Sequence, residues 1–240
     1  MKENGLAKIG NVRKANDLIE YLKNRPKTEM VGLGLIYGQP GLGKSRFARV
    51  SAIQNDYIYL RLEASMTLKS FATKLLEMIY YHFDMPKTVI KGNVSQILDK
   101  SLEILRNYIN TVIVIDEIDY AFNSRKILGT IRDIVDETLS IVILVGMSDA
   151  KENLLSLDSH YFDRCNFFCE FKPLSTDDIQ LICKEICEVK IDPLVIKYLS
   201  SKTNGNIRKL IKILYSLENL ATRDNLEEIS IEHLTAQTKE

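Results

Sequence analysis

The feature that most constrains this chain is the segment GQPGLGKS, Gly38 to Ser45, which directly follows the apolar run MVGLGLIY. Glycine is costly in conformational entropy, so a loop this rich in it must need unusual dihedral angles or a close backbone approach. The segment matches the pattern G-x-x-x-x-G-K-[ST], in which backbone amides form an anion-binding nest at the start of a helix. Because the apolar run reads as a buried strand and KSRFARVSAIQ as a helix, we predict a phosphate-binding loop rather than an ordinary glycine-rich turn.

The loop pattern assigns roles to its residues. Lys44 is expected to reach the β- and γ-phosphates of ATP or ADP, and the Ser45 hydroxyl is expected to ligate Mg²⁺. The other residues expected to bind the nucleotide are Gly38, Gln39, Pro40, Gly41, Leu42, Gly43 and Arg46.

A second motif, VIVIDEID, places two adjacent acids after a β-branched run. Ligands of open α/β sheets bind at the carboxyl ends of the strands. Asp116 is therefore expected to assist Mg²⁺, usually through water, and Glu117 to orient and polarise the attacking water. The alternative is a charged strand exit without function.

Strands alternate with helices along the first part of the chain, which predicts an α/β fold around a parallel sheet. The expected strands are the run that ends at Tyr37, YIYLRL, TVIVIDEID, LSIVILVGMS and NFFCEF. Only helical segments follow Pro173, the first with Thr176 as a plausible N-cap. We therefore predict a five-stranded nucleotide-binding domain over residues 1–172 and a small all-helical lid over residues 173–240.

Composition narrows the class of protein. The chain has 240 residues, with 32 Lys and Arg against 32 Asp and Glu, so any nucleic-acid surface must be a local patch. No apolar run reaches the ~18 residues of a membrane span, and MKENGLAKIG lacks a signal-peptide core. We expect a cytoplasmic protein without a membrane partner.

The four cysteines, Cys165, Cys169, Cys183 and Cys187, raise the question of a zinc site. Cys165 and Cys169 flank NFF in an expected strand, whose ~13 Å span is too long for two ligands of one metal. Reduced and mostly buried thiols are the favoured interpretation.

Three polar residues could complete the site. Ser148, at the end of the fourth expected strand, could sense the γ-phosphate or cap the next helix. Arg164 could reach a neighbouring subunit's nucleotide as an arginine finger. Arg208, in TNGNIRKL, could lean from the lid onto the phosphates, although both arginines could equally belong to a solvated face.

These motifs occur in the order of Walker A, Walker B, sensor 1, arginine finger and sensor 2 in the AAA+ ATPases, and the chain resembles that superfamily from about residue 10 to 225. Within it, GLIYGQPGLGKSRFA, IGNVRKANDLIEYL and YFDRCNFFCEFKPLS look like the MuB-type transposition ATPases. The narrower resemblance implies an ATPase that forms oligomers or helical filaments on duplex DNA and stimulates a transposase.

Since no separate helix-turn-helix domain precedes the loop, DNA contacts are expected from the core. The candidates are Lys69, Lys87, Lys91, Arg125 and Lys126. A filament would repeat such a patch, so a few weak phosphate contacts per subunit could suffice; ordinary solvated side chains are the alternative.

Two other functions compete with transposition target capture. One is a replication initiator or helicase loader of the same fold. The other is a nucleotide-gated switch with negligible turnover. Phosphate release with and without duplex DNA separates the switch from the two ATPases, whose hydrolysis is expected to be slow and stimulated by DNA and by oligomerisation.

Overall fold

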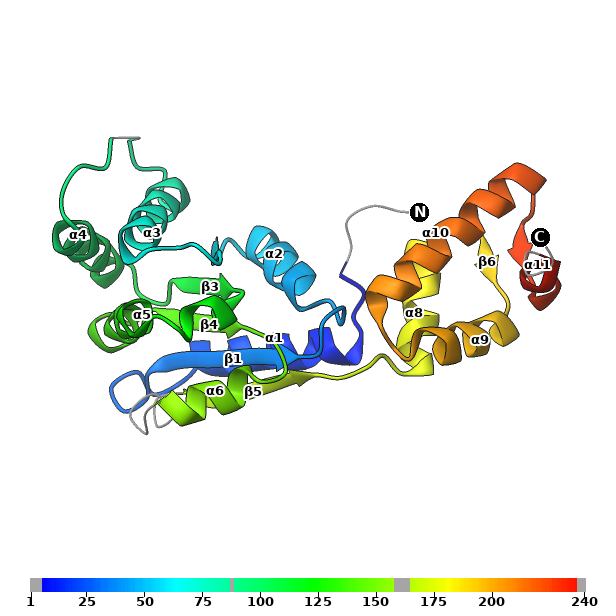
Figure 1. Ribbon diagram of the computed structural model, residues 1–240, viewed down its shortest axis with the longest axis horizontal. Coiled ribbons are helices and arrows are strands. Elements are labelled where there is room, and N and C mark those ends of the chain that lie inside the picture. The colour runs from blue at the N-terminus through cyan, green and yellow to red at the C-terminus, as the bar shows by residue number, and fades with distance from the viewer. Residues whose placement is uncertain (1–5, 87–88, 158–164, 237–240) are drawn as a thin grey trace. The chain divides into compact units, whose positions relative to one another are not determined.

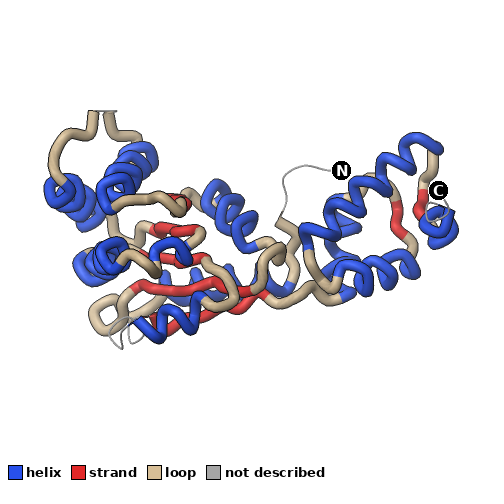
Figure 2. The backbone as a smooth tube through the Cα atoms, viewed as in Figure 1, coloured by secondary structure: helices blue, strands red, loops and turns tan. Residues whose placement is uncertain are grey.

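The structure is a computed structural model that describes residues 6–86, 89–157 and 165–236. It comprises two compact units (Figures 1 and 2). The sheet unit spans Ala15–Gly38 and Lys44–Glu170, and the C-terminal unit groups Phe171–Glu240 with Met1–Lys14 and Gln39–Gly43. The tip of the glycine-rich loop therefore belongs with the C-terminal helices.

The sheet unit is built on a five-stranded parallel sheet with the order β2-β3-β4-β1-β5. Its strands are β1 (Gly32–Gly38), β2 (Ile58–Arg61), β3 (Val112–Asp116), β4 (Ile141–Val145) and β5 (Cys165–Phe171). Every residue of β3 and β4 is buried, as expected where helices cover both faces of a parallel sheet. The predicted α/β class is confirmed.

Helices of the sheet unit cover the sheet (Figure 1). They are α1 (Gly10–Lys23), which belongs to this unit from Ala15 onward, α2 (Lys44–Gln54), α3 (Leu68–His82), α4 (Val94–Asn107), α5 (Arg125–Glu137) and α6 (Ala150–Leu157), with the 3₁₀ helix η1 (Ile118–Ala121) after β3. Leu33 and Leu35 pack in one core with α3, α4 and α5. Gly34 faces the other way, where a Cβ would come within 2.9 Å of Leu18 and Leu22 of α1. A glycine in β1 therefore lets α1 approach the sheet closely.

The C-terminal unit consists of helices joined by one short strand pair. Its helices are α8 (Thr176–Ile186), α9 (Pro193–Thr203), α10 (Ile207–Asp224) and α11 (Ile231–Ala236). The parallel strands β6 (Lys190–Ile191) and β7 (Glu228–Ile229) have two residues each. The C-terminal segment is therefore mainly helical but not all-helical as expected. Strands of two residues leave no periodic pattern in a sequence, so the pair could not be predicted.

Several element boundaries differ from the sequence predictions. The third expected strand, TVIVIDEID, ends at Asp116, because Glu117 adopts a left-handed conformation and the 3₁₀ helix η1 follows. Two further differences concern a predicted cap and a predicted site residue. The N-cap of α8 is Ser175, whose side chain accepts the Asp178 N–H in a capping box, and Thr176 is already helical. Either hydroxyl could cap a helix, and the extended backbone at Ser175 (φ −72°, ψ 166°) decides between them. The fourth strand ends at Val145, before Gly146, so Ser148 lies beyond it in a loop.

All four cysteines are buried free thiols. Cys165 and Cys169 lie in β5 as predicted, and Cys187 directly follows α8, which contains Cys183. Among the described residues, no group of three or more His, Cys, Asp or Glu is placed to hold a metal ion. Within the same ranges, no helix is both long enough and apolar enough to cross a membrane.

Candidate nucleotide-binding site

The glycine-rich loop connects β1 to α2 through backbone conformations that favour glycine. Gly38, Gly41 and Gly43 have φ angles of 146°, 82° and 93°. Residues with a Cβ rarely adopt these values, which accounts for the spacing of the glycines. The loop ends at Lys44, the first residue of α2. The N–H groups at the start of a helix favour binding of an anion. The backbone therefore fits a phosphate group.

Lys44 is buried, with 7% of its surface exposed. Its Nζ donates a hydrogen bond of 2.7 Å to the carbonyl oxygen of Gly38. A buried ammonium group is stable only when its donors are used, and this bond holds the cation beside the end of β1. The position suits a cation that contacts phosphate oxygens.

The first turn of α10 contacts the tip of the loop, within the C-terminal unit. The Asn206 amide donates to the carbonyl oxygen of Pro40 at 3.2 Å, and the backbone N–H of Arg208 donates to that of Gly41, also at 3.2 Å. A Cβ on Gly41 would lie 2.4 Å from the Asn206 amide nitrogen. The loop tip and α10 therefore fit each other only with glycine at this position.

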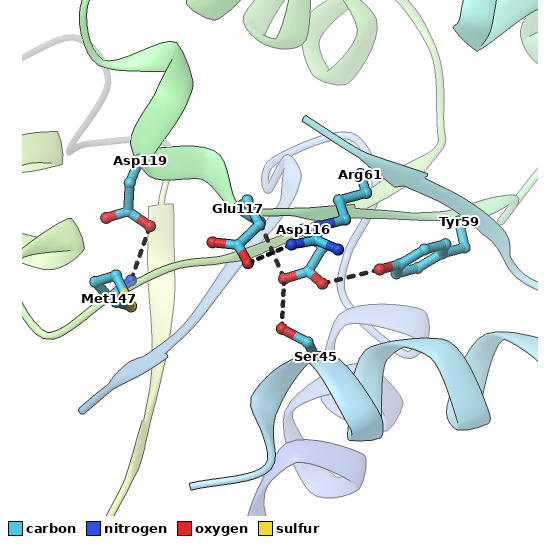
Figure 3. Close-up of polar contacts among 7 residues, drawn as sticks. All are labelled: Ser45, Tyr59, Arg61, Asp116, Glu117, Asp119 and Met147. Carbon is cyan, nitrogen blue, oxygen red and sulfur yellow. Dashed lines mark hydrogen bonds and ion pairs between the residues drawn. The ribbon is translucent and has the colours of Figure 1, made fainter. Parts of the chain in front are cut away.

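The carboxylate of Asp116 is the centre of a hydrogen-bond cluster at the end of β3 (Figure 3). Only 1% of the residue is exposed. Its Oδ1 accepts from the Ser45 hydroxyl at 3.2 Å and from the Glu117 N–H at 2.9 Å, and its Oδ2 accepts from the Tyr59 hydroxyl at 2.8 Å. A hydroxyl and a carboxylate oxygen side by side are ligands that Mg²⁺ prefers, so the donor set fits this ion.

Glu117 adopts a left-handed backbone conformation, with φ 59° and ψ 44°. This conformation costs a residue with a side chain ~1–2 kcal/mol, and such strain concentrates at functional sites. Arg61 Nη2 lies 3.2 Å from Glu117 Oε1 (Figure 3). Glu117 therefore has a cationic partner at the end of β2.

Asp119 is a third acid of the same motif, and the motif pattern assigns it no role. Its Oδ2 accepts the backbone N–H of Met147 at 2.9 Å (Figure 3), which ties η1 to the loop after β4. Burial raises the pKa of Asp119, while the Met147 N–H and the charge of Lys44 oppose this shift. The available signal in the sequence is an acid two residues after Glu117, at the end of the same motif.

Ser148 does not extend from a strand end. The residue is exposed in the loop after β4, and its hydroxyl donates to the neighbouring Asp149 carboxylate at 2.8 Å. Arg208 is exposed in the first turn of α10, and Arg46 is exposed in the first turn of α2. Arg164 lies outside the described residues.

The candidate DNA contacts fall on separate elements. Lys69 is exposed in the first turn of α3, and Arg125 and Lys126 are exposed in the first turn of α5. These helices follow the C-terminal ends of β2 and β3 along the chain. Lys91 is exposed in the segment before α4, and Lys87 lies outside the described residues.

Comparison with known proteins places the chain in a family. The AAA domain family matches residues 29–154. No curated protein sequence matches the chain. Among solved structures, one similar protein is Aeropyrum pernix ORC2, in ADPNP and ADP complexes, with 16% sequence identity and a TM-score of 0.70. The match covers 96% of this chain and 68% of the ORC2 chain. The A. pernix ORC1 protein in complex with DNA is 17% identical with a TM-score of 0.65, covering 98% of this chain and 65% of its own.

A third similar structure is a point mutant of Thermotoga maritima RuvB, 17% identical with a TM-score of 0.61, covering 100% of this chain and 73% of its own. The chain thus spans about two thirds of the length of the two ORC structures. At these identities the structural likeness shows the fold, and the family match covers more than half of the chain. The chain belongs to the AAA family of P-loop ATPases.

Proposed function

We propose that the chain binds ATP at the glycine-rich loop and hydrolyses it with the carboxylates that follow β3. The observation that carries this proposal is the meeting of Ser45, from the start of α2, with Asp116, from the end of β3, at 3.2 Å. A loop that fits phosphate and an oxygen pair that fits Mg²⁺ belong to one site.

Each residue of this site has a defined task. Lys44 and the loop amides bind the phosphates, and Ser45 and Asp116 would hold Mg²⁺. When bound, the ion neutralises charge on the phosphoryl oxygens. Glu117 orients the attacking water and accepts its proton. Its ion pair with Arg61 at 3.2 Å is partly exposed, so the pair is weak and can give way to the attacking water.

We further propose that the ATPase acts on duplex DNA as a replication initiator or helicase loader. The similarity to the ORC structures, one of them in complex with DNA, supports this choice. A CDC6P structure from Pyrobaculum aerophilum, 18% identical with a TM-score of 0.63, supports it too. Transposition is the second candidate, and its support is the MuB-type resemblance of the loop and β5 segments.

Phosphate release in the presence and absence of duplex DNA tests the proposal. Wild-type protein should release phosphate slowly without DNA and faster with DNA. Lys44→Ala protein should release no phosphate under either condition. ATP binding without release would favour the nucleotide-gated switch. Absence of ATP binding in the wild-type protein would overturn the assignment of the site.

Electron microscopy of the protein with ATP and duplex DNA separates the two DNA functions. Helical filaments that coat any duplex would support the MuB-type function and, with it, a transposase partner. Discrete oligomers on DNA would support the initiator-type function. In either assembly, Arg164 is proposed to act on the nucleotide of a neighbouring subunit.

A further inference from the structure

The edge strand β2 supplies a hydrogen-bond partner to each of the two carboxylates of the site. Tyr59 and Arg61 are two residues apart, so their side chains leave the same face of the strand. The register pairs Tyr59 with Val114 and Arg61 with Asp116. In Figure 3, the Tyr59 hydroxyl points at Asp116 and the Arg61 guanidinium points at Glu117.

The contacts of Asp116 divide between its two oxygens. Oδ1 is shared by the Ser45 hydroxyl and the Glu117 N–H, whereas Oδ2 accepts from the Tyr59 hydroxyl at 2.8 Å. The terminal torsion of an aspartate has a broad profile, so the backbone alone does not fix which way the two oxygens point. A donor on Oδ2 keeps Oδ1 turned towards Ser45.

The direction of this hydrogen bond follows from its partners. A carboxylate oxygen has no proton to give, so the Tyr59 hydroxyl donates and Asp116 Oδ2 accepts at 2.8 Å. Since only 1% of Asp116 is exposed, water cannot readily replace this donor if it is removed.

We propose that Tyr59 is a positioning residue of the metal site, which orients the Asp116 carboxylate for Mg²⁺. This inference rests on the proposed function, since Asp116 must be a Mg²⁺ partner. Hydrogen bonds to metal-binding carboxylates fix their orientation, and their removal typically weakens metal affinity 10–100-fold.

The competing explanation is packing. Tyr59 also lines a pocket of about 670 Å³ between α2, β2 and α3, together with Ala52, Tyr57 and Met78. A phenylalanine would fill the same wall of this pocket. The two explanations therefore differ in what the hydroxyl group does, and Tyr59→Phe separates them.

Tyr57→Phe is the matched control. Tyr57 lines the same pocket, and its ring lies under the Lys23 ammonium, whose Nζ is 5.2 Å from the ring centroid. Both variants remove one hydroxyl from the same region of the chain and leave the ring in place.

The test is a titration of each protein–ADP complex with Mn²⁺, followed by electron paramagnetic resonance, with ADP affinity measured separately in EDTA. Tyr59→Phe should weaken Mn²⁺ binding ~10–100-fold and change metal-free ADP affinity less than about twofold, and Tyr57→Phe should change neither. In an Asp116→Asn background, Tyr59→Phe should cause no further loss, because coupled residues are not additive.

Two negative results have different meanings. If Asp116→Asn weakens Mn²⁺ binding and Tyr59→Phe does not, Tyr59 is a packing residue and this proposal is wrong, while the site stands. If the wild-type protein binds no Mn²⁺ with ADP, or Asp116→Asn binds it equally well, the proposed metal site itself fails.

Discussion

At the scale of single residues, Asp119 shows how the site adds a pH dependence to stability. Burial raises its folded-state pKa above the ordinary 3.8. The native state therefore holds more protons than the unfolded chain between pH 3.8 and the raised pKa. The free energy of unfolding must fall as pH rises through this window.

Asp119→Asn should remove that fall. The asparagine Oδ1 can still accept the Met147 N–H that Asp119 accepts at 2.9 Å, but it does not titrate. Urea denaturation from about pH 4 to about pH 7 should show the variant gaining stability relative to wild type as pH rises. If the stability of the variant relative to wild type stays constant or falls as pH rises, Asp119 ionises in the folded protein without a burial cost.

Local spacing made some site residues predictable and left others hidden. Lys44, Ser45, Asp116 and Glu117 belong to short motifs whose chemistry can be read from neighbouring letters. Tyr59 and Asn206 work through partners 57 and 166 residues away. Contacts at such separations depend on strand order and helix packing, which no local pattern specifies.

At the scale of elements, the start of α10 combines two tasks in Asn206. Its Oδ1 accepts the Lys209 N–H at 3.1 Å as an N-cap, and its Nδ2 donates to the Pro40 carbonyl at 3.2 Å. The first contact stabilises the helix, and the second fixes the tip of the glycine-rich loop. One side chain thus caps α10 and binds the tip of the loop.

Two variants separate these tasks. Asn206→Ser keeps a good N-cap, but its side chain is too short to reach the Pro40 carbonyl. Asn206→Ala loses both contacts, and loss of the cap costs about 1 kcal/mol of stability. We expect only the alanine variant to lower the midpoint of thermal unfolding, and both variants to weaken ADP binding several-fold in calorimetry. Wild-type ADP affinity in the serine variant would show that the hydrogen bond from Asn206 to the Pro40 carbonyl does not support nucleotide binding by the loop.

Periodicity specified the longer elements well. The segment KSRFARVSAIQ, expected as a helix, is α2 (Lys44–Gln54), and the expected strand NFFCEF lies within β5 (Cys165–Phe171). The expected fourth strand, LSIVILVGMS, extends three residues past the end of β4 at Val145, because neither a charged residue nor a proline interrupts Gly146–Ser148. The strand actually ends where Gly146 packs closely against Ala150 and Ile118.

At the scale of the whole molecule, charge is balanced, so the proposed affinity for DNA requires a local basic surface. Arg125 and Lys126 are exposed at the start of α5, after the strand that carries Asp116. The double variant Arg125→Glu, Lys126→Glu should lose DNA stimulation of phosphate release and keep the basal rate. The matched charge control reverses two exposed lysines of the C-terminal unit, Lys184→Glu in α8 and Lys197→Glu in α9.

DNA stimulation should also weaken steeply as salt is raised from about 50 to about 200 mM, because contacts to phosphate release counterions. The Arg125→Glu, Lys126→Glu variant should show a shallower salt dependence than wild type. Equal stimulation in the Arg125→Glu, Lys126→Glu variant and in the Lys184→Glu, Lys197→Glu control would place the DNA surface elsewhere on the molecule.

The central claim is that the glycine-rich loop and the acids after β3 form one ATPase site, and hydrolysis by Glu117→Gln protein saturated with ATP tests it most directly. The glutamine cannot accept a proton, but Lys44, Ser45 and Asp116 remain to bind the nucleotide. We predict ATP affinity close to wild type and hydrolysis at least ~100-fold slower in a single-turnover assay, the scale of one acid–base group. Hydrolysis at the wild-type rate would contradict the account.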